Sequence, residues 1–65
     1  MWCVEVSVKE SAPYYWSGVE LHLRCETAIG DARRLLGRYK QVRVVDVESC
    51  TPLWSLIQGK EKDYV

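Results

Sequence analysis

The sequence lacks the features that would direct the chain to a membrane or to a charged polymer. It contains no long apolar run, so we expect no transmembrane helix. The N-terminal stretch MWCVEVSVKE has no basic segment followed by an apolar core, so we also expect no signal peptide. Nine basic and nine acidic residues cancel, and no net charge attracts the chain to nucleic acid or lipid.

Cysteine and histidine are too few, and too scattered, to indicate a site. Cys3, Cys25 and Cys50 are odd in number and widely spaced, which argues against a disulfide framework and against zinc. His22 is the single histidine, and no sequence pattern supplies the nucleophile and orienting group that a catalytic base needs. We therefore expect a reduced, cytoplasmic protein that is not an enzyme, with no metal, no cofactor and no small-molecule substrate.

The chain is short, which makes a partner attractive as a source of stability. Its 65 residues form one domain, and a domain of this size buries only about 60% of the surface that the unfolded chain exposes. Such domains usually need disulfides, a metal or a partner. With the first two unexpected, we expect another protein or a second copy of the chain, hence a homodimer.

Two segments near the N-terminus alternate between apolar and polar residues. Residues 2–9 and 19–25 each show the period of two that is typical of half-buried strands. The loop between them contains Pro13 and Gly18, so the two strands are predicted to form an antiparallel hairpin. If both apolar rows share one face, Val4 lies opposite Leu23.

An amphipathic helix is predicted over residues 27–39. Thr27 is suited to the N-cap, because its hydroxyl can accept a hydrogen bond from an amide of the first turn. At 100° per residue the apolar positions fall within one stripe suited to covering a sheet. That stripe consists of Ala28, Ile29, Ala32, Leu35, Leu36 and Tyr39.

The remaining segments complete an α+β fold. Residues 41–48 are rich in valine and predict a central strand. Residues 53–57 predict a fourth strand, with a helical turn as the alternative, because short apolar runs are ambiguous. The expected domain spans residues 1–58 as ββαββ, with sheet order 2-1-3-4, a mostly antiparallel sheet and the helix on one face. Residues 59–65 are expected to be a charged, flexible tail.

The second half of the chain resembles a group of small bacterial and phage proteins. The stretch ARRLLGRYKQVRVVDVESCTPLW, within residues 27–57, is similar to the ends of small uncharacterised ββαββ proteins of phage type. In such sequences glycine often follows the turn serine, where this chain has Cys50. The resemblance implies the fold and a phage or prophage origin, and it transfers no functional residue.

A sheet with one helix leaves its second face uncovered, and this face is the preferred candidate for function. Large exposed apolar patches usually mark interfaces, and tyrosine and tryptophan are frequent anchors. We therefore predict a protein-interaction module that binds or inhibits another protein. Alternatively, the aromatic loop is a lid over the core. The predicted interaction residues are Tyr14, Tyr15, Trp16, Trp54 and Leu56.

A nucleic-acid-binding accessory or regulatory protein is the alternative function. Several cations lie on or just after the outward side of the predicted helix, and each phosphate contact would add a salt-dependent contribution to affinity. Aromatic side chains could add base stacking. The basic residues are Arg33, Arg34, Arg38, Lys40 and Arg43.

Overall fold

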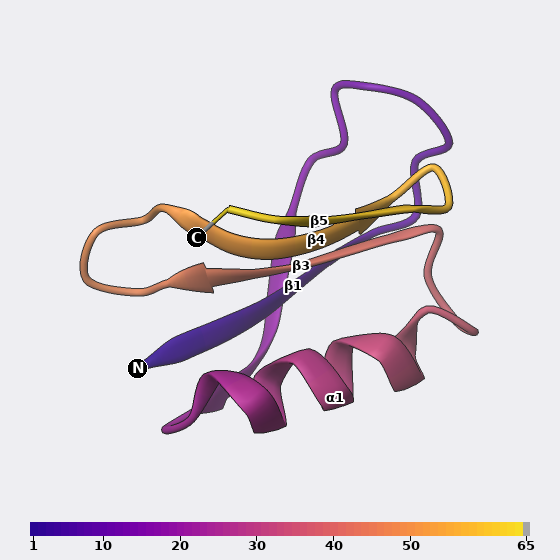
Figure 1. The fold of residues 1–65 in the computed structure, drawn as a ribbon. Coiled ribbons are helices and arrows are strands. Elements are labelled where there is room, and N and C mark those ends of the chain that lie inside the picture. Colours follow the sequence, from indigo (N-terminus) through magenta and orange to yellow (C-terminus); the bar gives the residue numbers. More distant parts are fainter. Residues whose placement is uncertain (65) are drawn as a thin grey trace.

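The computed structural model describes residues 1–64, which form one helix on one face of a five-stranded sheet (Figure 1). The strands are neighbours in the order β2-β1-β3-β4-β5, and every neighbouring pair is antiparallel. The α+β class and the predicted order of the first four strands are confirmed. The elements are β1 (Trp2–Ser7), β2 (Ser17–His22), α1 (Cys25–Leu35), β3 (Gln41–Asp46), β4 (Pro52–Ile57) and β5 (Lys60–Asp63).

The core lies between α1 and the inner strands of the sheet, mainly β1 and β3. The strands β1 and β3 contribute β-branched side chains that suit a pleated, buried surface, and α1 contributes two alanines, whose small size lets the helix lie close to the sheet. Burial of each valine contributes about 1.5–3 kcal/mol. The buried core residues are Val4, Val6, Ala28, Ala32, Val42, Val44 and Trp54.

The helix begins earlier than predicted and ends earlier too. The N-cap position is Arg24, whose side chain makes no capping hydrogen bond, so the prediction that Thr27 is the N-cap was wrong. Thr27 lies within the first turn, where its hydroxyl donates to the Arg24 carbonyl at 2.9 Å. The apolar stripe itself is confirmed. Its larger members pack against the core: Ile29, Leu35, Leu36 and Tyr39.

The predicted flexible tail is largely a strand. Residues 60–63 form β5 against β4, so the sheet has five strands within the described chain, and the prediction of four was wrong. Gln58 and Gly59 both have positive φ, at 55° and 75°, which is the backbone of a two-residue hairpin turn. Residues 52–57 are strand β4, which excludes the helical-turn alternative. The last residue of the predicted tail, Val65, lies outside the described residues.

Strand β2 pairs with β1 in a different register from the one predicted. Residues of the same parity face each other, so Leu21 shares a face with Cys3, away from the helix. A slip of one residue moves every side chain of a strand to the opposite face. The pairing of Val4 with Leu23 was therefore wrong, and β2 turns its polar row toward α1. The observed pairs before the bulge at residues 4 and 5 of β1 are Trp2–His22, Cys3–Leu21 and Val4–Glu20.

Candidate interaction surface along strand β2

Strand β2 is an edge of the sheet, and its apolar residues are exposed. Leu21 lies on the sheet face away from α1, whereas Val19 is the extra residue of a β-bulge and lies near Val6 and Tyr39. Val19, Leu21 and the following Leu23 are 44%, 59% and 82% exposed. β2 has a hydrogen-bonded neighbour on one side, β1. An exposed edge strand offers unpaired backbone groups to another chain, and here those groups are flanked by apolar side chains.

The opposite edge of the sheet has a different chemistry. All four residues of β5 are charged and exposed, in the order Lys60, Glu61, Lys62 and Asp63. Charged side chains, lysine above all, discourage a sheet edge from pairing with another chain. Of the two edges, β2 is therefore the one available for association.

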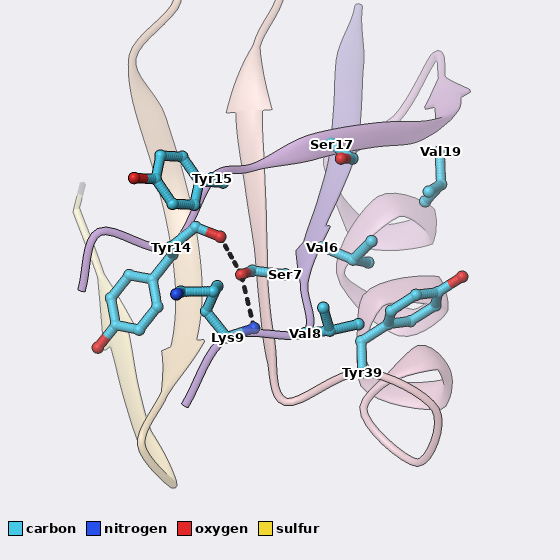
Figure 2. A pocket seen from close by; sticks show the side chains of 9 residues that line it. All are labelled: Val6, Ser7, Val8, Lys9, Tyr14, Tyr15, Ser17, Val19 and Tyr39. Atoms are coloured by element: carbon cyan, nitrogen blue, oxygen red, sulfur yellow. Dashed lines mark hydrogen bonds between the residues drawn. The ribbon is translucent and has the colours of Figure 1, made fainter. Parts of the chain in front are cut away.

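A hollow of about 470 Å³ opens beside the first residues of β2 (Figure 2). The Ser7 hydroxyl donates to the Tyr14 carbonyl and accepts from the Lys9 amide at 3.1 Å, which fixes the loop over the end of β1. The hollow offers apolar walls next to the exposed edge. Its lining residues are Val6, Ser7, Val8, Lys9, Tyr14, Tyr15, Ser17, Val19 and Tyr39.

A second hollow, of about 300 Å³, lies on the sheet face away from the helix, and Leu21 contributes to its wall. Burial raises the pKa of the Cys3 thiol, and the neighbouring Glu5 carboxylate raises it further, so this thiol is protonated and a weak nucleophile at neutral pH. The lining is suited to packing and not to covalent chemistry. It consists of Cys3, Glu5, Leu21, Arg43, Val45, Asp46, Val47 and Cys50.

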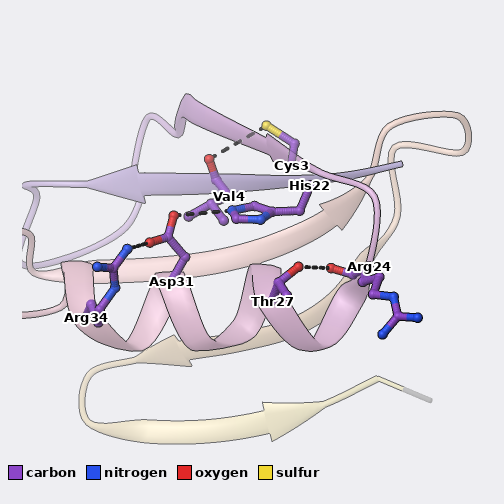
Figure 3. Close-up of polar contacts among 7 residues, drawn as sticks. All are labelled: Cys3, Val4, His22, Arg24, Thr27, Asp31 and Arg34. Atoms are coloured by element: carbon purple, nitrogen blue, oxygen red, sulfur yellow. Dashed lines mark hydrogen bonds and ion pairs between the residues drawn. The ribbon is translucent and has the colours of Figure 1, made fainter.

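On the helix side, the polar row of β2 meets a buried carboxylate of α1 (Figure 3). The Nε2 atom of His22 lies 3.2 Å from Oδ2 of Asp31, whose residue is 6% exposed. Arg34, one turn along the helix, donates to the other carboxylate oxygen. Asp31 thus joins β2 to α1 and is supplied with partners on both oxygens, as a buried charge requires.

The neighbouring carboxyl group of Glu20 changes the acid–base behaviour of this cluster. Hydrogen bonds from the Glu20 carboxyl and then from Arg34 lower the pKa of Asp31 to about 2. The same hydrogen bond and the negative charge of Asp31 raise the pKa of Glu20. Asp31 is therefore held in its charged form, and the charged form of Glu20 is disfavoured beside it.

The same three residues have the donor atoms of a metal site. One ligand atom from each of Glu20, His22 and Asp31 lies within 4.8 Å of the others, and carboxylate with imidazole suits first-row divalent cations. However, Arg34 already provides a positive charge to Asp31. Sequence reasoning missed this cluster. The i, i+2 spacing on β2 was visible, but the buried aspartate comes from another element.

One of the predicted interaction residues belongs to the core, and another packs against it. Trp54 is 1% exposed, and Cζ of Arg33 lies 5.3 Å from the centroid of the Trp54 ring. Its Nε1 atom donates to Glu61 at 2.9 Å, and this hydrogen bond, followed by the charge of Arg33, lowers the pKa of Glu61. Leu56 is half-buried against the core. Trp54 is therefore inaccessible to a partner, and Leu56 is only partly accessible.

The three aromatic residues of the loop do not all fit the same predicted role, which was either a lid or an interaction surface. The Trp16 ring lies under the Arg43 guanidinium at 4.4 Å, and Tyr14 packs against Trp16 with ring centroids 5.7 Å apart. These two side chains act as a lid on the sheet face opposite the helix. Tyr15 is 71% exposed and stands beside the hollow near Val19.

The predicted basic cluster is divided among separate ion pairs. Arg43 lies on the sheet face that α1 does not cover, because it is paired in register with Glu5. Arg38 stacks over Tyr39. The five basic side chains therefore do not form one continuous positive surface. The pairs are Arg33–Glu61 at 2.7 Å, Arg34–Asp31, Lys40–Glu10 at 3.5 Å and Arg43–Glu5 at 2.6 Å.

Comparisons with protein-family models, with curated proteins and with solved structures found no match. In the part of the chain that the structure describes, no helix is both long and apolar enough to cross a membrane.

Proposed function

We propose that the protein is a small interaction module that binds a strand of a protein partner along the β2 edge. The observation that carries this proposal is the contrast between the edges: β2 exposes Val19 and Leu21, with Leu23 exposed just after it, while all four residues of β5 are charged and exposed. In strand addition, main-chain hydrogen bonds supply affinity and pockets for alternate side chains supply specificity.

The geometry around β2 supports both contributions. The backbone of residues 17–22 is paired on one side and exposed on the other. The two hollows, which reach Val19 and Leu21, offer apolar space to side chains of an added strand. Tyr15 adds a rigid aromatic surface at the rim of the first hollow.

Nucleic-acid binding is the weaker proposal, because the required cations are already engaged. Four of the five basic side chains predicted for it contact an acidic side chain of the same chain. A phosphate would have to displace those partners, and it would not gain the full affinity of a free positive surface.

Site-specific photo-crosslinking tests the proposed function. A benzophenone amino acid at Leu21 should capture a protein chain in cells, because this position lies on the available edge. The same group at Lys62 is the matched control, since Lys62 lies on the other edge strand and on the same sheet face. We expect at least several-fold more adduct at position 21. Equal capture at both positions, or none, would contradict the proposal.

A further inference from the structure

Three side chains with metal-binding atoms converge between β2 and α1. Glu20 and His22 are two residues apart on one strand, so their side chains lie on the same face of the sheet. Asp31 points toward His22 from the helix (Figure 3). One ligand atom of each residue lies within 4.8 Å of the others. The cluster thus combines one imidazole with two carboxylates, and two different elements of the fold supply them.

We propose that Glu20, His22 and Asp31 bind one zinc-like divalent cation, which joins strand β2 to helix α1. Zn²⁺ takes imidazole and carboxylate ligands, and a site with three protein ligands leaves the fourth position to water. Imidazole also suits zinc better than it suits magnesium or calcium. The inference does not depend on what binds the β2 edge, and it replaces the expectation of no metal that the sequence alone suggested.

The distances within the cluster fit a bound cation. Bonds of about 2.0–2.1 Å to a tetrahedral ion place two ligand atoms about 3.3 Å apart. Nε2 of His22 and Oδ2 of Asp31 are 3.2 Å apart, so these two atoms already have the separation of two ligands of one ion. Glu20 is exposed, and its carboxylate can approach them by rotation of its side chain alone.

Asp31 has the surroundings of a preorganised ligand. Its side chain is 5% exposed, so the direction of its carboxylate is fixed by the packing around it. Arg34 donates a hydrogen bond to Oδ1, whereas Oδ2 faces the cluster. Metal sites commonly hold a ligating carboxylate in this way, by an outer hydrogen bond to the oxygen that does not bind the ion. Arg34 therefore orients Asp31 and leaves Oδ2 for the cation.

The charges of the cluster favour a cation. Two carboxyl groups, those of Glu20 and Asp31, stand against one guanidinium, that of Arg34. The Arg34 side chain is 80% exposed, so water weakens its attraction to Asp31. A divalent ion between the two carboxylates would be attracted by both, and coordination to a metal is one of the ways in which a buried charge is stabilised.

The ion has a path to the cluster and a structural use there. The His22 side chain is 17% exposed and Glu20 is exposed, so an ion can enter from the solvent at the β2 edge. Domains of this size often add a structural metal to a small core. Here the ion would connect an edge strand to the helix through residues that are otherwise polar.

Calorimetric titration with zinc chloride tests the site, in a chain whose three cysteines are replaced by serine so that no thiolate binds the ion. We expect one equivalent of Zn²⁺ per chain. Glu20→Gln should weaken binding at least about 10-fold, because it removes a ligand, and it should fold because Glu20 is exposed. Glu26→Gln, in the exposed first turn of α1, is the control and should bind as tightly as the parent. No binding, or an equal loss in both variants, would overturn the proposal.

Nuclear magnetic resonance of the imidazole identifies the ligand in the unmodified, reduced chain. His22 is the single histidine, so the ring signals report on this cluster alone. Zn²⁺ should shift the nitrogen resonance of Nε2 and leave Nδ1 protonated. It should also raise the urea midpoint of the native chain, since an ion that binds only the folded state stabilises it. Zinc binding that leaves the ring signals unchanged would place the ion elsewhere and contradict the assignment.

Discussion

Strands β2 and β5 are the two edges of one sheet, and each is tied to the helix in its own way. β5 reaches α1 through Glu61, which contacts Arg33 and caps the buried Trp54. β2 reaches α1 through His22 and the buried Asp31. At the β5 edge the ion pair Arg33–Glu61 covers the large apolar side chain of Trp54. At the β2 edge the pair His22–Asp31 is itself the contact between strand and helix.

This difference explains why the outer surfaces of the edges differ. The face of a strand that points inward fixes which residues point outward. Because Glu20 and His22 of β2 face Asp31, Leu21 between them points away from the helix and is exposed. β5 has charged residues on both faces, so neither side presents an apolar row. The sheet therefore has one edge suited to association and one protected against it.

The largest expected effect is on the β5 side of the core. Trp54→Ala should lower the free energy of unfolding by about 3–5 kcal/mol, because the indole is fully buried and its removal leaves a cavity. Urea denaturation followed by circular dichroism measures this. Trp16→Ala is the control, since Trp16 is only half-buried in the loop, and it should cost much less. Equal losses would show that Trp54 does not close the core.

A smaller effect is expected at the β2 side. Asp31→Asn should cost about 1–2 kcal/mol, because it weakens hydrogen bonds of a buried group to Arg34 and His22. Glu26→Gln, in the exposed first turn of α1, is the control and should change stability little. If both variants unfold alike, the cluster does not hold β2 to the helix.

Acid titration sharpens the same comparison. The pKa of Asp31 is lowered from 3.8 to about 2, so its stabilising contribution is complete above pH 3.8 and is lost as the pH falls toward 2. We expect the native chain to lose more stability than Asp31→Asn between pH 4 and 2. Parallel stability curves over this range would contradict the assignment.

The smallest effect on folding, with a large effect on association, is expected from removing the charges of β5. Lys60→Val combined with Lys62→Val should change the free energy of unfolding by less than about 0.5 kcal/mol, since both positions are exposed. One face of the second edge then becomes apolar, while Glu61 and Asp63 stay on the other, and we expect assemblies larger than those of the native chain by light scattering. Glu48→Val, in an exposed turn, should not enlarge the assemblies, and a double variant of native size would show that charge does not protect β5.

Some parts of this fold could be predicted from the sequence because their patterns have one solution. The stripe from Ala28 to Tyr39 can bury only one side of a helix, and consecutive valines at 44 and 45 fit a central strand buried on both faces. The alternating pattern of β2 was compatible with two orientations of the strand relative to the helix. It defined two rows of side chains, and hydrophobicity favoured the wrong row for the core. The pattern of the strand contains no information about Asp31, which decides between them.

The candidate site was harder to predict from the sequence than the fold was, for the same reason. Tyr15 and Trp54 were both predicted as interaction residues, but Tyr15 is exposed, whereas Trp54 is covered by Arg33 and Glu61. The charged segment after Gly59 resembled a tail, because a strand composed of charged residues is stable only when a neighbouring strand supplies its hydrogen bonds. Each of these corrections depends on a residue far away in the sequence.

By itself, then, the sequence determined the helix, the two central strands and the order in which the first four strands pair, since local periodicity and short connections suffice for these. Only the tertiary structure decided which face of β2 is buried and which edge of the sheet is protected. The physical reason is that a buried carboxylate must be given partners. Asp31 takes His22 from β2, and Leu21, the residue before His22, then lies on the opposite face and is exposed.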